Sequence, residues 1–172
     1  MMKAELQKAF NKQINEELYS AYLYTAMINY FELENLGGFA SWVRAQTIEE
    51  LAHTSKLIGY LHERGVDVKF GAIAKPTATW KNTLTAFEAI YKHECHISAC
   101  INKLYGLALK LDDHAAAIFL TWFVNEQVEE EANASEIVQQ LKLAKDTPGP
   151  MFMLNRELGA RAIAFPAAPA TE

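Results

Sequence analysis

Cysteine, proline and glycine are scarce in this chain, and their shortage narrows what it can be. Its 172 residues include only two cysteines, five prolines and eight glycines. Cys95 and Cys100 lie on one predicted helix, at a spacing that turns them to different faces, so we do not expect a disulfide between them. Two free thiols are typical of a protein in a reducing cytoplasm. Signals for turns are correspondingly sparse.

From the sequence we also expect no basic surface, no membrane span and no secretory leader. Its net charge of −5 argues against nucleic acid as a partner, because such binding needs a basic face. The longest nearly apolar stretch is interrupted by Ser20, Thr25 and Asn29, and is too short and polar to span a membrane. Lys3 and Glu5 fall where a signal peptide would be apolar. We therefore expect a cytoplasmic protein without a membrane partner.

What the sequence has in abundance is helical periodicity. Hydrophobic residues make up 51% of the chain and charged residues 22%, which suits one domain over residues 1–172 with a sizeable core. The few turn signals divide it into four long helices, a short fifth helix and an Ala/Pro-rich tail that we expect to be mobile. The helices are predicted at 3–34, 39–64, 81–111, 114–145 and 151–161, with the bundle over 3–145 and the tail over 162–172.

The lengths of the connections predict how the helices are arranged. Gly37 and Gly38 are expected to stop the first helix and allow a tight reversal, and Asp112 and Asp113 suit a turn and an N-cap. These short links make antiparallel hairpins. Residues 66–80 lack helical period, and about 15 extended residues span roughly 50 Å, enough to run the length of the bundle. The sequence thus predicts an all-α four-helix bundle with one long crossover connection.

The core-facing seam of each long helix is interrupted near its middle by polar residues. A bundle helix should be apolar at alternating steps of three and four residues, and each seam otherwise is. In such a bundle the midpoints of the four helices meet at one level, so the interruptions should converge. They are Glu17 in the first helix, Glu50 and His53 in the second, Glu94 in the third, and Gln127 and Glu130 in the fourth.

Four buried carboxylates require cations, because burying an unpaired charge costs on the order of several kcal/mol. The seams offer no lysine or arginine, so the cations must come from outside the chain. Glu50 and His53 are spaced i, i+3 and point the same way, which is half of the pattern of di-metal bundles. One Glu-x-x-His is more often a solvated face than a metal site, and the coincidence in four helices carries the prediction. Oxygen-rich ligation with one imidazole suits iron or manganese better than zinc.

A second acidic group accompanies these residues. Glu126, Glu129 and Glu130 lie at i, i+3 and i+4, and Glu49 precedes Glu50. A run of acidic residues is usually a solvated face. The competing interpretation is a third metal position on the inner side of the bundle, and the sequence leaves both open.

Four stretches of the sequence resemble bacterial non-haem ferritins, and together they extend the resemblance over essentially the whole chain. They are Asn15-Glu16-Glu17 through Tyr24, the EELAH segment at 49–53, His93-Glu94, and TWFVNEQVEEE at 121–131. The resemblance implies a ferritin-like bundle with a short fifth helix. It also implies a ferroxidase centre whose di-iron pair is held by Glu17, Glu50, His53, Glu94 and Glu130, with Gln127 nearby. A third iron site is implied at Glu49, Glu126, Glu129 and Glu130. Tyr24 matches a tyrosine that supplies an electron.

The resemblance further implies oxidation of Fe²⁺ by O₂ or H₂O₂, and storage of a ferric mineral in a hollow homo-oligomer of 24 subunits. Gln127-x-x-Glu130 stands where the full di-metal pattern has Glu-x-x-His, which makes the second iron position poorer in ligands and suits a site that iron passes through. The same departure separates the chain from bacterioferritins. Leu51 and Ala52 occupy the stretch where bacterioferritins carry a haem-ligating methionine, so no haem is expected.

Two other functions compete with storage. A di-iron peroxidase or oxidase of the rubrerythrin type would normally bring a Cys-x-x-Cys domain, which this sequence lacks. A bundle that acts only through assembly would leave the polar layer unexplained. Assembly itself has independent support, because residues 18–31 carry no charge and a helix apolar on most faces is buried on most faces.

Overall fold

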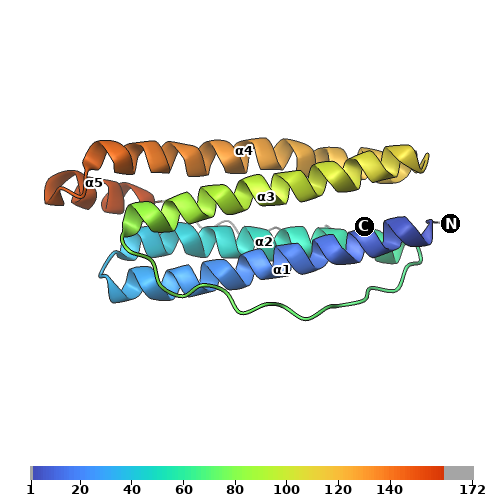
Figure 1. The fold of residues 1–172 in the computed structure, drawn as a ribbon, viewed down its shortest axis with the longest axis horizontal. Helices are drawn as coiled ribbons and strands as arrows, with labels where there is room; N and C mark the ends of the chain where they lie inside the picture. Colours follow the sequence, from blue (N-terminus) through green and yellow to red (C-terminus); the bar gives the residue numbers. More distant parts are fainter. Residues whose placement is uncertain (1, 161–172) are drawn as a thin grey trace, which may run out of the picture.

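The computed structural model describes residues 2–160 as five helices without a strand (Figure 1). Four long helices lie side by side and a short fifth caps one end of the bundle, which confirms the all-α prediction. No helix among these residues is long and apolar enough to cross a membrane. The predicted tail at 162–172 lies outside the described residues. The helices are α1 (Ala4–Leu33), α2 (Gly37–Glu63), α3 (Thr83–Lys110), α4 (His114–Ala144) and α5 (Pro148–Gly159).

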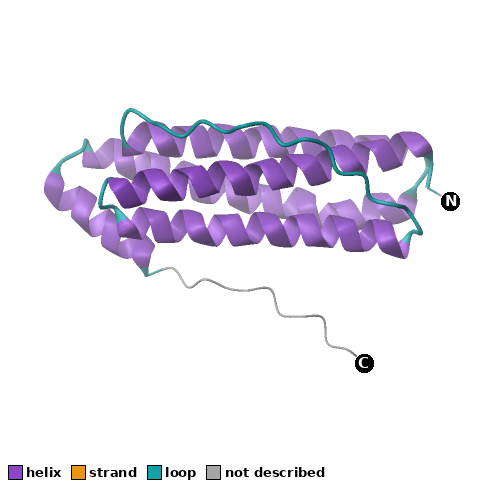
Figure 2. Cartoon of the chain, turned by 90° about the horizontal axis from the view of Figure 1, so that it is seen from below, coloured by secondary structure: helices purple, strands orange, loops and turns teal. Residues whose placement is uncertain are grey.

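One long connection gives the bundle its topology. The segment between α2 and α3 has no regular structure and runs from one end of the bundle to the other (Figure 2). It is fastened to α1, because the Asn15 side chain donates to the Ala72 carbonyl at 3.1 Å and the Lys69 amide donates to Asn11 at 2.9 Å. The predicted crossover is therefore confirmed, with α2 and α3 parallel and the other neighbours joined as antiparallel hairpins.

The prediction for Gly37 and Gly38 is wrong in its detail. They begin α2, and the reversal is made just before them, with Asn35 at a φ of 58°. Glycine is needed at 38 for a tertiary reason, since a Cβ there would lie 1.6 Å from the backbone oxygen of Asn155 in α5. The Asn155 side chain accepts from the amides of Gly38 and Phe39 at 2.9 and 3.2 Å, so a distant helix caps the N-terminus of α2.

The start of α5 also differs from the prediction. The helix begins at Pro148, where the sequence suggested a break as far as residue 150. Proline is tolerated in the first helical turn, because its missing N–H would have no partner there. The predicted last residue, at 161, lies outside the described part of the chain.

Two apolar clusters form the core, one toward each end of the bundle. At the α5 end the rings of Phe31, Phe39 and Phe87 lie 5.5 or 5.6 Å apart. At the other end Tyr60 stacks on Phe119 at 3.9 Å. Burying each such side chain stabilises the fold by about 1.5–3 kcal/mol. The middle of the bundle, between the clusters, is left to polar residues.

Candidate metal centre

The polar layer between the two clusters contains all six residues that interrupt the predicted seams. Every one is buried, with at most 6% of its surface exposed. All four long helices contribute, as the convergence of their midpoints requires. The residues are Glu17 of α1, Glu50 and His53 of α2, Glu94 of α3, and Gln127 and Glu130 of α4.

Glu17, Glu50 and His53 form the compact part of this layer. One ligand atom from each lies within 4.8 Å of the others. His53 Nδ1 is 3.7 Å from Glu50 Oε2 and 4.0 Å from Glu17 Oε2. Those two oxygens are buried and have no hydrogen-bond partner. An imidazole nitrogen and two unpaired carboxylate oxygens that face one space form a ligand set for a metal ion.

Glu94, Gln127 and Glu130 adjoin this group from the opposite pair of helices. The Tyr24 hydroxyl donates to Glu94 Oε1, and Gln127 Nε2 donates to Glu94 Oε2 at 3.3 Å. Glu130 Oε2 accepts from Gln46 Nε2 at 2.6 Å. The Gln127 side-chain oxygen is buried without a partner. This half of the layer therefore also holds oxygen atoms in orientations that a cation would satisfy.

Electrostatics explain why the carboxylates of this layer favour neutralisation, by protons or by a cation. Burial is the largest cause that raises the pKa of Glu17 and Glu50 well above the ordinary value, and neighbouring carboxylates raise it further. Burial also raises the pKa of Glu94 and of Glu130 to about 7. Among residues 2–160, no lysine or arginine forms an ion pair with these four groups. A divalent metal ion would offset the repulsion between the carboxylates. It would also coordinate the oxygens that have no hydrogen-bond partner.

Tyr24 and His93 lie on the α1–α3 side of the layer. Tyr24 is fully buried, and burial followed by the adjacent Glu94 raises the pKa of its hydroxyl, so it stays protonated and donates. Burial lowers the pKa of His93 to about 4, and its Nε2 lies 2.8 Å from the Ser20 hydroxyl. His93 is thus a neutral ring packed at 5.9 Å against Tyr24, and it does not belong to the ligand group.

The predicted third position is more open. Glu49 and Glu126 are half-buried and Glu129 is exposed. Glu49 is close enough to raise the pKa of both Glu50 and Glu130. No three of these acidic side chains bring ligand atoms within 4.8 Å of one another among the described residues. Occupation of this position stays a prediction.

Two glutamines were not assigned to the centre from the sequence. Gln13 donates to Glu17 Oε1 at 2.9 Å, and Gln46 holds Glu130. Both lie four residues before a predicted ligand, Glu17 or Glu50, on the same helix face. That spacing is the signal that could have identified them, because amides next to ligating carboxylates orient them.

Comparison with known proteins agrees with this architecture. Residues 7–144 match the family model described as ferritin, ferritin-like domain. The bacterial non-haem ferritin of Bacteroides fragilis (strain 638R) is 38% identical over 161 residues, 94% of this chain and 100% of the relative. That of Staphylococcus aureus (strain USA300) is 32% identical, covering 94% and 97%.

A solved structure is similar as well. An engineered closed form of the Archaeoglobus fulgidus ferritin superposes with a TM-score of 0.94 at 40% identity, and the match covers 95% of this chain and 100% of that one. The helix topology and the buried acidic layer are consistent with these similarities, which extend over nearly the whole length of the chain. The chain belongs to the ferritin family of iron-storage proteins.

Proposed function

We propose that the chain is the subunit of a ferroxidase-type ferritin, which oxidises Fe²⁺ at its buried acidic layer and stores the product as a ferric mineral. The observation that carries this proposal is the set of unpaired oxygens on Glu17, Glu50 and Gln127, buried beside His53 without a neutralising cation of the chain. Iron enters this scheme as substrate and cargo. The oxidant is O₂ or H₂O₂.

The contacts support the division of ligand roles that the family resemblance implies. Glu17 and His53 hold the first Fe²⁺, and Glu50 bridges to the second. Glu50 lies 3.7 Å from His53, and its pKa is raised by burial and then by Glu94 and Glu130. Glu94 and Glu130 hold the second ion, with Gln127 beside it. Two ions in such a site typically lie about 3.5–4 Å apart, which lets each give one electron to the same oxidant molecule.

The two halves of the centre have different partners in the protein. The first half has an imidazole and a carboxylate that Gln13 orients. In the second half, Tyr24 and Gln46 already donate to Glu94 and Glu130, and α4 supplies an amide rather than a second imidazole. Weaker ligation at the second position suits oxidised iron that must leave for storage. Tyr24 contacts a ligand directly and is placed to supply an electron or orient Glu94.

Storage requires assembly, and we propose a homo-oligomeric shell of 24 subunits as the family resemblance implies. Large apolar side chains lie exposed on the isolated chain, among them Tyr22 in the uncharged stretch of α1, Ile118 and Val128 of α4, and Phe152 of α5. Contact with neighbouring subunits would cover these side chains. A cytoplasmic location stays a prediction.

Two measurements test the function. Many equivalents of Fe²⁺ per subunit are added in air and the protein is sedimented. Iron should travel with a large assembly, whereas free ferric precipitate beside a monomer or dimer would refute storage. Replacing both Glu50 and His53 by alanine should abolish the fast phase of oxidation. The matched control, His62→Ala with Glu63→Ala, changes an exposed histidine–glutamate pair on the same helix and should keep the fast phase.

A further inference from the structure

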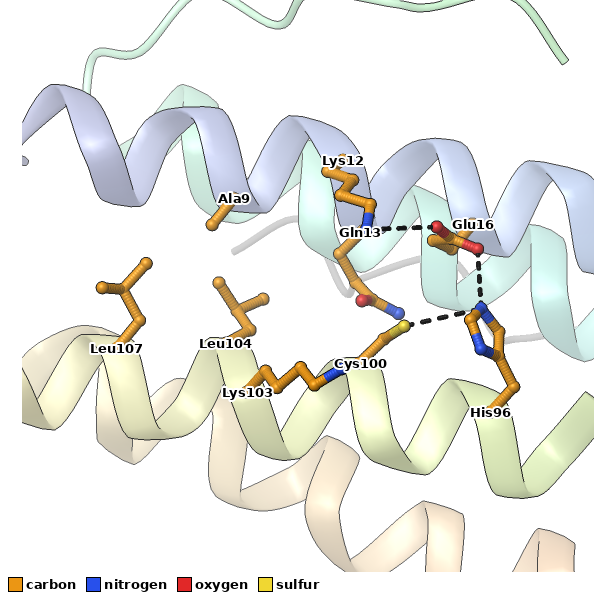
Figure 3. A pocket seen from close by; sticks show the side chains of 9 residues that line it. All are labelled: Ala9, Lys12, Gln13, Glu16, His96, Cys100, Lys103, Leu104 and Leu107. Carbon is orange, nitrogen blue, oxygen red and sulfur yellow. Dashed lines mark hydrogen bonds and ion pairs between the residues drawn. The ribbon is translucent and has the colours of Figure 1, made fainter.

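A cavity of about 200 Å³ opens between α1 and α3, outside the buried acidic layer (Figure 3). Its polar wall is made by three residues of α1 and three of α3, which are Lys12, Gln13, Glu16, His96, Cys100 and Lys103. The Glu16 side chain is 22% exposed and that of His96 54% exposed, so solvent reaches this wall directly. A dissolved ion could therefore enter without passing through the bundle.

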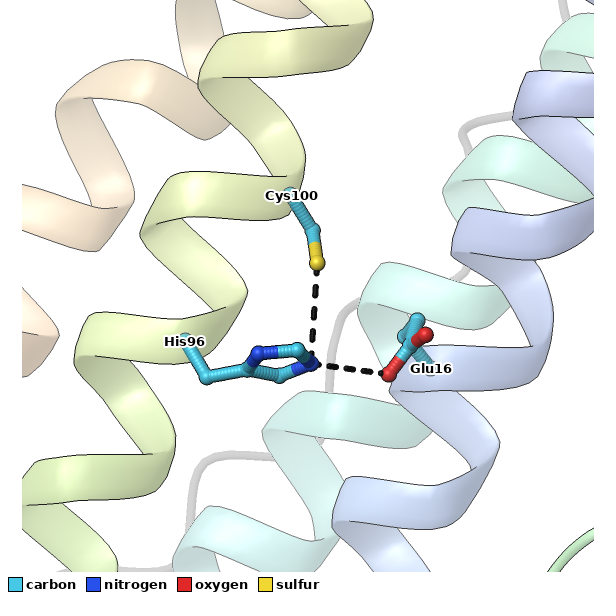
Figure 4. A group of neighbouring side chains, drawn as sticks. All are labelled: Glu16, His96 and Cys100. Carbon is cyan, nitrogen blue, oxygen red and sulfur yellow. Dashed lines mark hydrogen bonds and ion pairs between the residues drawn. The ribbon is translucent and has the colours of Figure 1, made fainter.

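Glu16, His96 and Cys100 point toward one another across the two helices (Figure 4). One ligand atom from each lies within 4.8 Å of the others, as in the iron centre. His96 Nε2 is 3.1 Å from Glu16 Oε2 and 3.6 Å from Cys100 Sγ. A tetrahedral zinc ion with ordinary bond lengths would hold nitrogen and oxygen about 3.3 Å apart, and sulfur and nitrogen about 3.6 Å apart. The two distances from His96 are therefore close to those of such a site, and the third pair, Glu16 and Cys100, lies within 4.8 Å.

We propose that Glu16, His96 and Cys100 bind a divalent cation of the zinc class on the surface between α1 and α3. Three protein ligands with water in the fourth position form an open zinc site. Thiolate and imidazole favour zinc, while the buried layer, rich in carboxylates, favours iron. The site needs no residue of the iron centre and stands whether or not the chain oxidises iron.

Residues around the group support binding. Lys12 lies 3.7 Å from Glu16 Oε1, the oxygen that does not face His96, and so orients the other oxygen toward the group (Figure 3). Burial raises the pKa of the Cys100 thiol, while Lys12 and Lys103 act in the opposite direction. The thiol accordingly carries its proton in the metal-free protein, and the incoming ion forms the metal–sulfur bond as that proton passes to solvent.

The competing interpretation is that Glu16, His96 and Cys100 only form hydrogen bonds with one another and never bind a metal ion. Titration with cobalt distinguishes this interpretation from a metal site. Co²⁺ replaces zinc, and only a cobalt–thiolate bond gives an intense sulfur-to-metal charge-transfer band in the near ultraviolet. The reduced, full-length assembly is titrated with CoCl₂ and then with ZnCl₂. We expect the band to appear with about one Co²⁺ per subunit at this site and to disappear as zinc displaces cobalt. Cobalt in the iron centre, which has oxygen and nitrogen ligands only, gives no such band.

The chain contains its own control for sulfur. Cys100→Ser should remove the charge-transfer band. Cys95, the only other thiol of the sequence, lies outside the group, so Cys95→Ser should keep the band. His96→Gln should weaken cobalt binding at least about tenfold, and His62→Gln, an exposed change on α2, should leave it unaltered. No band in the unmodified protein, or a band that survives Cys100→Ser, would overturn the proposal.

Thiol alkylation provides a second measurement on the unmodified chain, independent of how the variants fold. Zinc should slow iodoacetamide labelling of Cys100 at least about tenfold, and Mg²⁺, which avoids sulfur ligands, should not. Cys95 serves as the internal reference, with labelling unaffected by either ion. Equal rates at Cys100 with and without zinc would count against the site.

Discussion

Glu16 and Glu17 are neighbours in the chain but belong to two very different groups. Glu17 is 1% exposed and shares the buried layer with Glu50 and His53. Glu16 faces the cavity between α1 and α3, with Lys12 at one oxygen and His96 at the other. One step along a helix turns a side chain by about 100°, which is enough to move it from the core to the surface.

The comparison shows how burial changes what a carboxylate requires. Glu16 is served by solvent, a lysine and a histidine, so it is stable without metal. Glu17 has Gln13 at one oxygen and no hydrogen bond at the other. An acidic group in that environment is stabilised by protonation or by a cation. Burial of Glu17 therefore lowers the stability of the metal-free fold, and the solvent-accessible position of Glu16 does not.

The substitution Glu17→Ala tests the difference between the two glutamates most directly. Losing a carboxylate of the compact group should lower the initial rate of Fe²⁺ oxidation at least about 100-fold, because mutation even of residues that only support metal ligands costs about 10–100-fold. Stopped-flow absorbance of ferric products measures this rate. Glu5→Ala, an exposed change in the first turn of α1, should keep the full rate. Similar rates in the two variants would remove Glu17 from the centre.

A second test concerns the stability of the metal-free protein. Glu94→Gln keeps the shape of the side chain and removes a group whose pKa is raised to about 7. Above that pH the native protein must hold a buried charge, whereas below it the carboxyl is protonated and resembles the amide. The free energy of unfolding of the variant should therefore exceed that of the wild-type protein by on the order of 1–2 kcal/mol at pH 8. This difference should vanish near pH 5.

Denaturant titrations with a chelator present measure this difference. The raised pKa of Glu94 means that the native state binds more protons than the unfolded state at pH values between the unfolded and the native pKa of this carboxyl. Wild-type stability accordingly falls as the pH rises toward 7. An advantage that does not change with pH would show that Glu94 is not the titrating group.

The smallest expected effect sharpens the role of Tyr24. Tyr24→Phe removes the hydroxyl that donates to Glu94 and leaves the ring in its buried position. If the tyrosine only orients the ligand, oxidation should slow by no more than about tenfold, because a typical hydrogen bond contributes about 0.5–1.5 kcal/mol net. A tyrosyl radical signal in freeze-quenched wild-type samples, absent from the variant, would add the electron-donor role. An unchanged rate without a radical would exclude both roles.

Much of the buried centre was predictable because it follows helix geometry. The residues Glu17, Glu50, Glu94 and Glu130 lie on the same face as the apolar residues before and after them, so periodicity alone places them in the core. Similar helix lengths, from 27 to 31 residues, then bring them to one level, and the length of the crossover gives the topology. Gln13 and Gln46 share the spacing but were not assigned, because each lies one turn away from the ligands of its own helix and carries no charge that must be neutralised.

Contacts outside the apolar seams, between residues far apart in the chain, were not predictable. Gly38 was interpreted as a turn former, whereas its smallness is required by the backbone of Asn155 more than one hundred positions away. His96 lies 80 positions from Glu16, and neither stands out in its own helix. Which exposed faces come together depends on how α3 is placed against α1, and surface residues have no apolar period that reports it.

Hydrophobic period and uncompensated charge are properties of each helix alone, so the order of the amino acids already specifies a helical bundle with a buried acidic layer. The oxygens without partners, the cap that Asn155 of α5 provides for α2, and the meeting of Glu16, His96 and Cys100 become visible only in the packed fold. These features depend on atomic distances between helices, which the packing of the core determines and no single helix encodes.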